Sequence, residues 1–295
     1  MATLRQWLTL LLIAGIWGSS FILIKRGLYG PEGGELFTNL QVGSLRIVIA
    51  AIVMLPFVFR NTSLLKAGKL KFYLVVGLCG NALPAFLFAT AQTHIPSALA
   101  GMLNTLVPLF SLVIAFFVFH VRVRIGQIVG IALGLISAAG LLLKSSSVLE
   151  NTNNIWYALL VVGATICYAI SLNIIKQFLQ EEPPVAITGL SLVLVSPIGF
   201  AILFSTDFVH RLTTFEGAYY GLGAVSILAV LGTAIALILF NRLVQETNTV
   251  FASSVTYLVP VFAILWGLGD GETLEVLQLI FAGTMVAGIY LINRK

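Results

Sequence analysis

Long apolar runs, separated by short polar segments, make up almost the whole chain. Ten such runs can be placed, and each approaches the roughly 20 mostly apolar residues that a spanning helix needs. Their hydrophobicity is continuous rather than alternating, which is typical of helices and not of the strands of a membrane barrel. The pattern therefore predicts an all-α integral membrane protein with ten transmembrane helices. The predicted spans cover residues 7–27, 37–59, 72–93, 97–119, 125–143, 156–178, 185–205, 218–241, 249–268 and 274–292.

The second half of the chain repeats the first. Residues 97–110 and 249–262 both contain Leu-Val-Pro in the same register. In front of these stretches, Gly80-Asn81-Ala82 matches Gly232-Thr233-Ala234. Self-similarity of this kind decides the architecture before any single motif does. The sequence therefore predicts that one unit of five spans is used twice.

Five spans per unit is an odd number, so the second unit must enter the bilayer from the opposite side. We therefore predict two inverted five-helix repeats, residues 1–147 and 148–295. In transporters with this symmetry, the substrate site lies near the bilayer midplane, at the interface between the repeats. The parity favours a carrier that moves a small-molecule metabolite by alternating access. Spans one to four and six to nine would enclose its central cavity, with spans five and ten outside.

Composition and charge support a membrane setting and restrict the partners. Of the residues, 59% are hydrophobic and only 9% are charged, whereas a soluble domain carries about 25% charged residues. Most lysines and arginines fall at span ends on the side of the two termini, and most acidic residues fall on the other side. The positive-inside rule then places both termini in the cytoplasm. Because the net charge of +5 reflects this topology, we expect a lipid bilayer around the chain and no nucleic-acid partner.

Arg46 lies about midway along the second predicted span. A charge at that depth is costly and normally faces a wet cavity or a charged partner. A guanidinium offers two parallel hydrogen bonds to a carboxylate or phosphate, so Arg46 is a candidate anchor for an anionic group of the substrate. The alternative is a structural arginine that donates hydrogen bonds to carbonyls of neighbouring helices.

Two aromatic residues and one lysine are further candidate substrate contacts. Trp17 and its repeat counterpart Tyr168 lie well inside their spans, where their rings can stack on a substrate or pack between helices. Lys25 lies near the outer end of the first span. Its long side chain can also extend to the membrane interface instead of the cavity.

Polar side chains within the spans complete the set of candidate substrate contacts, which adds Asn81, Gln92, Asn104 and Tyr257. Asn104 and Tyr257 come shortly before Pro108 and Pro260, and a proline frees a backbone carbonyl one turn earlier and can bend the helix. The alternative for the buried amides is a structural role, because polar side chains also join membrane helices to one another.

Several short motifs occur together in one order along both halves. These are residues 17–21 with Lys25, Leu45-Arg46, the two proline-containing spans, and Gly271-Glu272 followed by Gln278. In this order and spacing the chain resembles the drug/metabolite transporter superfamily, in particular its EamA-type ten-helix transporters. The resemblance implies export or exchange of small metabolites, such as amino acids, nucleotide sugars, phosphorylated sugars or drugs, across a bacterial cytoplasmic (inner) membrane. One departure is that His120-Val121 stands where the first repeat would carry a second Gly-Glu.

Two other functions stay open, a lipid-handling flippase and, less favoured, an intramembrane hydrolase. A flippase would need a polar track that opens sideways to lipid. The sequence Gly267-Leu268-Gly269-Asp270 matches the G-x-G-D of intramembrane aspartyl proteases, but the other aspartate, Asp207, falls in a predicted external loop. No plausible serine–histidine pair, metal-ligand cluster or phosphate-binding loop occurs, so we expect no enzyme and no cofactor.

Two further patterns concern assembly and energy coupling. Gly126, Gly130 and Gly134 form a row of small residues in the fifth span, which predicts close helix packing within a monomer, with a dimer seam as the alternative. All acidic residues fall in loops or at span ends. Because a proton antiporter of the embedded-carboxylate kind needs such a group within a span, we predict that the substrate gradient drives transport.

Overall fold

The chain folds into a bundle of helices. A computed structural model describes residues 3–60, 68–120, 124–143, 154–246, 255–273 and 275–293. Across these ranges the regular elements are helices, and one isolated bridge joins Tyr29 to Glu35. Seven helical runs are long and apolar enough to cross a membrane, and three shorter apolar helices lie at Ile125–Leu141, Leu258–Gly269 and Val276–Gly288. This confirms the prediction of an all-α protein with ten apolar spans.

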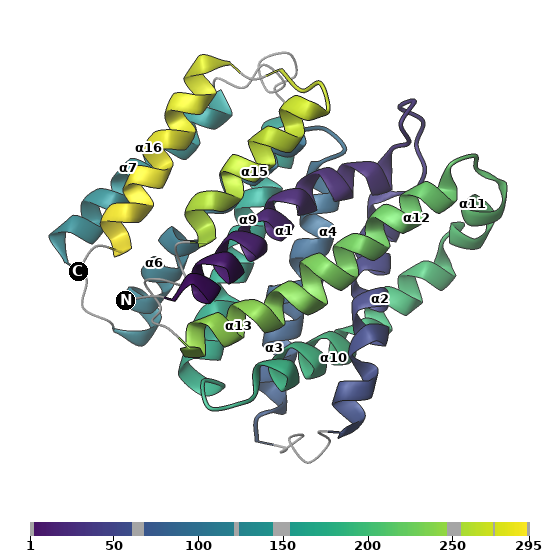
Figure 1. Cartoon of the computed structure of the whole chain (residues 1–295), viewed down its shortest axis with the longest axis horizontal. Helices are drawn as coiled ribbons and strands as arrows, with labels where there is room; N and C mark the ends of the chain where they lie inside the picture. Colours follow the sequence, from purple (N-terminus) through teal and green to yellow (C-terminus); the bar gives the residue numbers. More distant parts are fainter. Residues whose placement is uncertain are drawn as a thin grey trace.

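The two repeats have equivalent series of spans (Figure 1). Those of the first repeat are α1 (Leu4–Leu28), α2 (Asn39–Arg60), α3 (Leu70–Gly77) with η2 (Leu78–Ala82) and α4 (Leu83–Ala91), α5 (Ser97–Leu103) with η3 (Asn104–Leu106) and α6 (Val107–Phe119), and α7 (Ile125–Leu143). Those of the second are α9 (Asn154–Phe178), α10 (Pro184–Ser205), α12 (Ala218–Ile227) with η4 (Leu228–Ile235) and α13 (Ala236–Glu246), α15 (Val255–Gly269) and α16 (Val276–Asn293). The predicted boundary at residues 147 and 148 lies outside the described ranges.

The third and eighth spans are not continuous α-helices, which the apolar runs did not predict. Each changes to a π-helix in its middle, at η2 and at η4. These are the segments that carry the matching motifs Gly80-Asn81-Ala82 and Gly232-Thr233-Ala234. π-helical turns widen a helix and occur frequently at functional sites. The two repeats therefore share a local backbone irregularity as well as a sequence motif.

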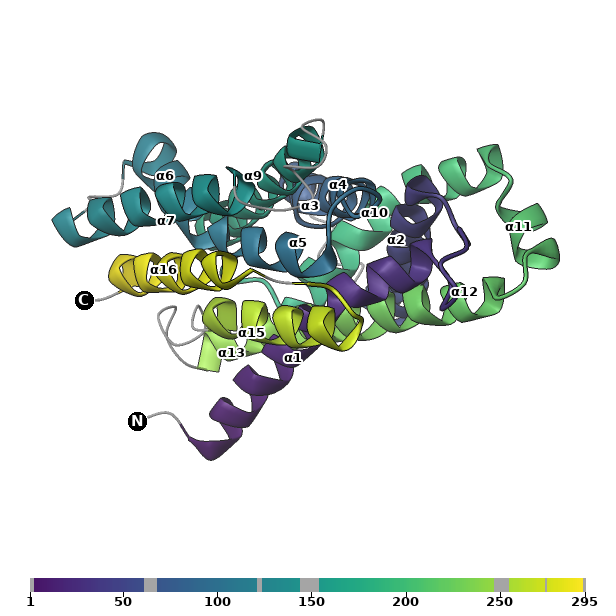
Figure 2. The same ribbon diagram turned by 90° about the horizontal axis from the view of Figure 1, so that it is seen from above.

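Each repeat packs its first helix against the other repeat. α1 contacts α12, α13 and α15, and α9 contacts the equivalent elements α3, α4 and α6. Figure 2 shows α1 beside α13 and α15. The equivalent helices α2 and α10 also pack against each other. This reciprocal arrangement is the one that two inverted copies of a single unit produce.

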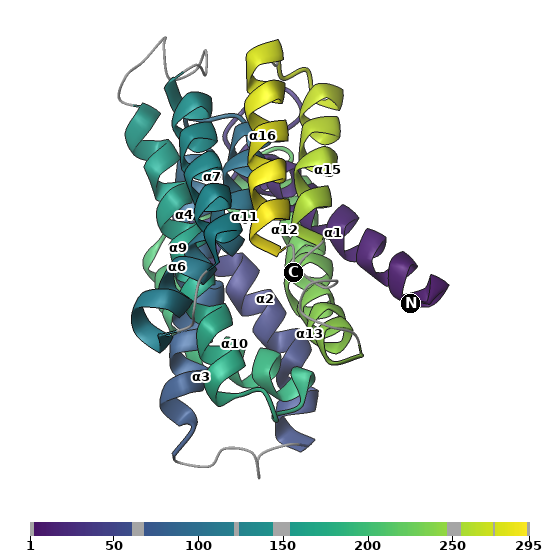
Figure 3. The same ribbon diagram turned by 90° about the vertical axis from the view of Figure 1, so that its left-hand side faces the viewer.

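The fifth and tenth spans, α7 and α16, lie side by side at one edge of the molecule (Figure 3). A Cβ atom on Gly288 of α16 would lie 2.8 Å from the carbonyl oxygen of Gly130 and 3.2 Å from the amide of Gly134. The hydroxyls of Ser137 and Thr284 form a hydrogen bond of 2.7 Å across the same seam. Of the predicted row, Gly130 and Gly134 thus pack closely against Gly288 within the chain, whereas a Cβ atom on Gly126 would meet nothing within 4 Å in the described structure.

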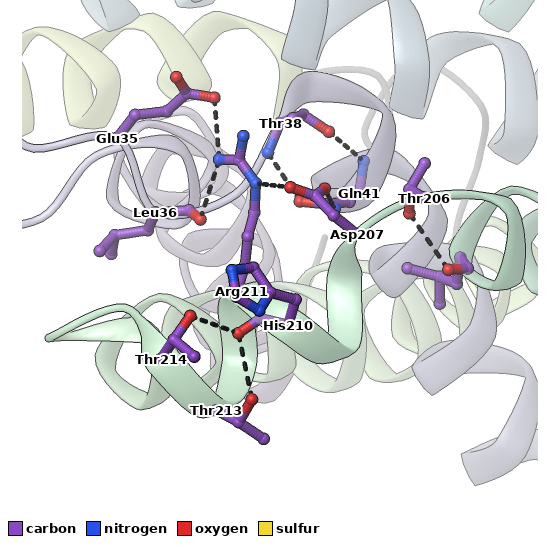
Figure 4. Close-up of polar contacts among 11 residues, drawn as sticks. Glu35, Leu36, Thr38, Gln41, Thr206, Asp207, His210, Arg211, Thr213 and Thr214 are labelled. Carbon is purple, nitrogen blue, oxygen red and sulfur yellow. Dashed lines mark hydrogen bonds and ion pairs between the residues drawn. The ribbon is translucent and has the colours of Figure 1, made fainter.

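The span ends define two faces of the bundle. We call the face with the first residues of α1, α3 and α10 the terminal face, and the face with the last residues of α1 and α15 the far face. On the far face, Arg211 of the short helix α11 (Phe208–Thr214) donates hydrogen bonds to Asp207 at 2.9 Å and to Glu35 at 3.1 Å (Figure 4). The amide of Gln41 donates to the other oxygen of Asp207 at 2.8 Å. These contacts tie α11 to the start of α2.

Candidate functional site

A central cavity lies between the two repeats. Its volume is about 170 Å³. Side chains and backbone of eight spans line it: Trp17, Ser20, Phe21 and Ile24 of the first, Arg46 of the second, Val76, Gly80, Asn81 and Phe88 of the third, Asn104 and Val107 of the fourth, Tyr168, Ser171, Leu172 and Ile175 of the sixth, Ile187, Thr188 and Ser191 of the seventh, Gly232, Thr233, Leu237, Phe240 and Asn241 of the eighth, and Thr256 and Val259 of the ninth. α7 and α16 contribute no residue to this lining, in agreement with the predicted role of spans five and ten.

Five of the eight predicted contact residues line this cavity, namely Trp17, Arg46, Asn81, Asn104 and Tyr168. Lys25 and Gln92 do not line it. Gln92 is buried at the end of α4, where neither its amide nitrogen nor its amide oxygen has a hydrogen-bond partner among the described residues. Tyr257 belongs to α15, but its side chain lies outside the described part of the structure.

Arg46 is the charged residue of the described lining. Its Nε donates a hydrogen bond to Oγ1 of Thr233 in η4, at 2.9 Å. No aspartate, glutamate or histidine occurs in this lining, and within the described ranges Arg46 forms no ion pair. A guanidinium between helices is costly without a counter-charge, so this one is suited to receive an anionic group.

Two pairs of aromatic rings stand on the cavity wall, and repeat symmetry relates them. The rings of Trp17 and Phe240 have centroids 5.0 Å apart, and those of Tyr168 and Phe88 have centroids 6.1 Å apart. Trp17 also donates its indole N–H to the carbonyl oxygen of Gly232 at 3.1 Å. These four rings provide apolar surface against which a hydrophobic part of a substrate can stack.

Amide and hydroxyl groups add polar contacts to the cavity. Asn81 belongs to the π-helical segment η2, and Asn104 begins the short 3₁₀ segment η3 just before Pro108. The 3₁₀ segment interrupts the α-helix of this span just before Pro108, whereas Pro260 lies inside the α-helix α15. The side-chain oxygens of Asn104 and Thr188 have no hydrogen-bond partner within the described structure. Buried acceptors without partners cost free energy, which a bound ligand or water can recover.

Lys25 joins a group of charged residues on the far face, beyond the end of the cavity. Its Nζ lies 2.5 Å from Oδ2 of Asp270 and 2.9 Å from Oε1 of Glu272. Arg26 forms a further ion pair with Asp270. We call these four residues, together with Ser97, the far-face cluster. Lys25 thus binds carboxylates of the protein itself rather than the cavity.

Glu272 occupies the centre of the far-face cluster. It accepts hydrogen bonds from the backbone N–H and hydroxyl of Ser97, at 3.0 and 2.8 Å, and from the N–H of Ala98 at 3.0 Å. Burial acts to raise the pKa of this carboxyl, but the hydrogen bond from Ala98, Lys25 and Ser97 together hold the pKa below its usual value. Glu272 is therefore a buried carboxylate that binds the start of α5 to the end of α15.

A second hollow, of about 870 Å³, lies on the other side of α1, between the eighth and ninth spans. Most of its lining is apolar, with Leu11, Leu12 and Phe262 among the contributors. Its charged residues are Arg26 and Asp270, which pair with each other. Within this lining, Trp266 of α15 donates its indole N–H to the hydroxyl of Ser19 of α1 at 2.8 Å.

Ten apolar spans in two inverted halves around a central cavity define a membrane transporter. The chain belongs to the EamA-like transporter family, whose model matches residues 5–143 and again residues 155–294. The two matches coincide with the two five-helix repeats, and together they establish an integral membrane protein of the drug/metabolite transporter superfamily.

Several known proteins are similar to this chain over almost its full length. An uncharacterized inner membrane transporter of Escherichia coli, YedA, is 27% identical over 94% of this chain and 87% of its own. A probable terminal-alkyne amino-acid exporter of Streptantibioticus cattleyicolor is 26% identical over 97% and 92%, and a probable amino-acid metabolite efflux pump of Salmonella typhimurium is 26% identical over 95% and 92%. A solved crystal structure shares the fold with a TM-score of 0.66 at 15% identity, covering 98% of this chain and 96% of its own.

Proposed function

We propose that this protein is a secondary transporter that exports or exchanges small amphipathic metabolites, such as amino acids, by alternating access. The observation that carries the proposal is the cavity, in which Arg46 lies among aromatic and amide side chains and has no carboxylate partner in the part of the chain that the structure describes. Two of the similar proteins are named as exporters or efflux pumps of amino acids or their metabolites, which supports this substrate class.

In the proposed complex, the carboxylate of the substrate binds the guanidinium of Arg46. Thr233 accepts a hydrogen bond from Nε of Arg46 and so holds the guanidinium in one orientation, and its remaining N–H groups suit a planar carboxylate. The side-chain oxygen of Asn104, for which the described residues provide no hydrogen-bond partner, can accept a hydrogen bond from a substrate amine. Trp17 and Tyr168 then contact the apolar part of the substrate.

We further propose that both termini lie in the cytoplasm and that the protein resides in the bacterial inner membrane. Lysines and arginines concentrate at span ends on the terminal face, which supports this orientation by the positive-inside rule. The far face would then be periplasmic, and export would carry the substrate from the terminal face to the far face.

Within the described residues, the structure does not show the features that the two alternative functions require. A flippase needs a polar track open to lipid, whereas the hollow beside α1 is mostly apolar and its two charges pair with each other. An aspartyl hydrolase needs two aspartates in one site. Asp207 binds Arg211 and Gln41, and Asp270 belongs to the far-face cluster, so the two aspartates occupy separate groups.

A transport screen in proteoliposomes tests the proposed function. The purified protein is reconstituted, and uptake of labelled amino acids is compared with movement of fluorescent phospholipids between leaflets. We expect saturable uptake of at least one amphipathic amino acid, and no acceleration of lipid movement over empty liposomes. Lipid movement without amino-acid uptake would favour the flippase, and neither activity would contradict the proposed substrate class.

A further inference from the structure

The geometry points to Glu272 as the positioning residue that closes the cavity toward the far face, and to two gates of unequal strength in this carrier. This inference rests on the proposed alternating-access function. Glu272 lies outside the described lining of the cavity. It predicts that the cavity without substrate opens preferentially toward the terminal face.

The first argument is the number of spans that this one carboxylate holds together. Glu272 follows α15, pairs with Lys25 of α1, and accepts hydrogen bonds from Ser97 and Ala98 at the start of α5. Its side chain is only 7% exposed. Hydrogen bonds between charged partners are roughly twice as strong as neutral ones, so three spans from both repeats are fixed at a single point.

The second argument is the position of this point relative to the cavity. Phe21 and Ile24 of α1 line the cavity, and Lys25 is the next residue along the helix toward the far face. The ring of Phe21 packs edge-on against that of Phe88, with centroids 5.6 Å apart. The far-face cluster thus lies immediately beyond the aromatic end of the cavity. To admit substrate from the far face, α1 must separate from α15 and α5, which breaks the contacts of Glu272.

The third argument is that the other repeat lacks this carboxylate. Repeat symmetry relates Lys25 to Lys176 and the Gly271-Glu272 pair to His120-Val121. In the sequence, the first repeat therefore carries valine at the position that is equivalent to Glu272, in place of the carboxylate that pairs with Lys25. Inverted repeats with identical gates would favour neither state. A single glutamate, present in one copy, biases the cycle toward the state that is closed on the far face.

Accessibility of a cavity residue from each side tests this inference without any substrate. The native Cys79 and Cys167 are replaced by serine, and Ser20→Cys places one thiol on the cavity wall. A membrane-impermeant maleimide is applied to intact cells and to inverted vesicles, with tags at the termini to assign the two sides. We expect faster labelling from the terminal face than from the far face in this parent.

The test variant is Glu272→Gln, and the matched control is Glu275→Gln in the same loop. Glutamine keeps the size of the side chain but loses the charge that binds Lys25, so far-face labelling should rise by about tenfold or more. Terminal-face labelling should stay constant or fall, because the population shifts between two states. Glu275 is exposed and forms no ion pair in the described structure, so its variant should label like the parent.

Loss of a monodisperse elution profile would show that Glu272→Gln does not fold. A second variant tests the inference in that case. Ser97→Ala removes one of the hydrogen bonds to Glu272 and should raise far-face labelling by a smaller factor. Unchanged far-face labelling in a folded variant would overturn the inference, and so would an equal rise on both sides, because loosening of the fold exposes both. Absence of transport in the parent would count against the proposed function alone, since labelling needs no substrate.

Discussion

Nε of Arg46 donates a hydrogen bond to Oγ1 of Thr233 at 2.9 Å, across the interface between the two repeats. Arg46 belongs to α2 of the first repeat, and Thr233 belongs to the π-helical segment η4 of the second. The bond fixes the guanidinium at the cavity wall without neutralising its charge. A substrate carboxylate bound here would touch both repeats, which is the contact that alternating access requires.

Arg46→Gln should lower transport of an anionic or zwitterionic substrate by about tenfold or more, because a hydrogen-bonded charge contributes about 1.5–3 kcal/mol. Arg46→Lys should also lower transport, since lysine retains the charge but loses the bidentate fork. Initial rates in proteoliposomes and elution profiles of the detergent-purified variants check both statements. We expect the fold to persist in both variants.

The control for this series is Arg242→Gln, which removes an arginine that is exposed and paired only with Glu246 on its own helix in the described structure. Transport by this variant should equal that of the parent. A folded Arg46→Gln protein with unchanged transport would refute the role of Arg46 as a substrate anchor. Loss of a monodisperse protein would instead show that Arg46 is structural.

Gly77→Ala should lower the stability of the bundle by about 1–3 kcal/mol, the usual cost of overpacking. A Cβ atom at this position of α3 would collide with the backbone carbonyl of Ser191 and lie 2.7 Å from Cγ1 of Val195, both on α10. Backbone atoms cannot rotate away, so the two helices must separate. Thermal unfolding in detergent, followed by intrinsic fluorescence, measures the effect.

Gly126→Ala is the matched substitution on α7. A Cβ atom there meets nothing within 4 Å in the described structure, and alanine has the higher helix propensity by about 1 kcal/mol. This variant should therefore unfold at the parent temperature or slightly above it. Equal destabilisation of both glycine variants would show that the approach of α3 to α10 does not limit stability.

Asp207 should make the stability of the far face depend on pH. The hydrogen bond from Arg211, with a further one from Gln41, holds the pKa of Asp207 below its usual value. Since the native pKa lies below the unfolded value of about 3.9, the contribution is complete above the unfolded value and is lost as the pH falls through the native one. The unfolding temperatures of the parent and Asp207→Asn should therefore differ near neutral pH and converge in acid.

The corresponding control is Glu216→Gln, because the side chain of Glu216 is exposed and forms no ion pair in the described structure. Its unfolding temperature should follow that of the parent across the whole titration. A constant difference between the parent and Asp207→Asn down to the lowest pH would contradict the proposed pH dependence.

Transport should depend little on an imposed pH gradient. The described cavity lining contains no aspartate, glutamate or histidine, so no group with a pKa near neutrality contacts the substrate there. Flux into proteoliposomes is measured with and without a pH step, at zero membrane potential. Accumulation of substrate against its own gradient, abolished by a protonophore, would contradict this prediction and implicate a titrating group outside the lining.

Much of the architecture could be predicted from the sequence because a bilayer restricts the choices. Long apolar runs in lipid must form helices or closed barrels, and the repeated prolines and glycines revealed the duplication. Arg46, Trp17 and Tyr168 were found as cavity residues for the same reason, since charged and aromatic side chains deep within a span need something other than lipid to contact.

Local backbone irregularities and long-range ion pairs were not predictable from the sequence. In the π-helical segments, a Cβ atom on Gly80 would lie 2.5 Å from Oγ of Ser171, and one on Gly232 would lie 3.0 Å from Oγ of Ser20. Neither the π-helices nor these close approaches between spans are visible in a hydropathy pattern. Lys25 was a candidate substrate contact, and its carboxylate partners Asp270 and Glu272 were not foreseen, because they lie far away along the chain. Glu272 was visible only as part of a family motif, with no indication that it binds α5.

Each repeat packs its first helix against the other repeat, and this affects the order in which the protein can assemble during synthesis. α1 leaves the ribosome first, but its partners α12, α13 and α15 begin at Ala218, Ala236 and Val255. The acceptor for the indole N–H of Trp17 is the carbonyl of Gly232, which is synthesised 215 residues later. During most of translation α1 therefore lacks its neighbours from the second repeat. The packing of α1 is expected to be completed late in translation, after the eighth and ninth spans have been inserted.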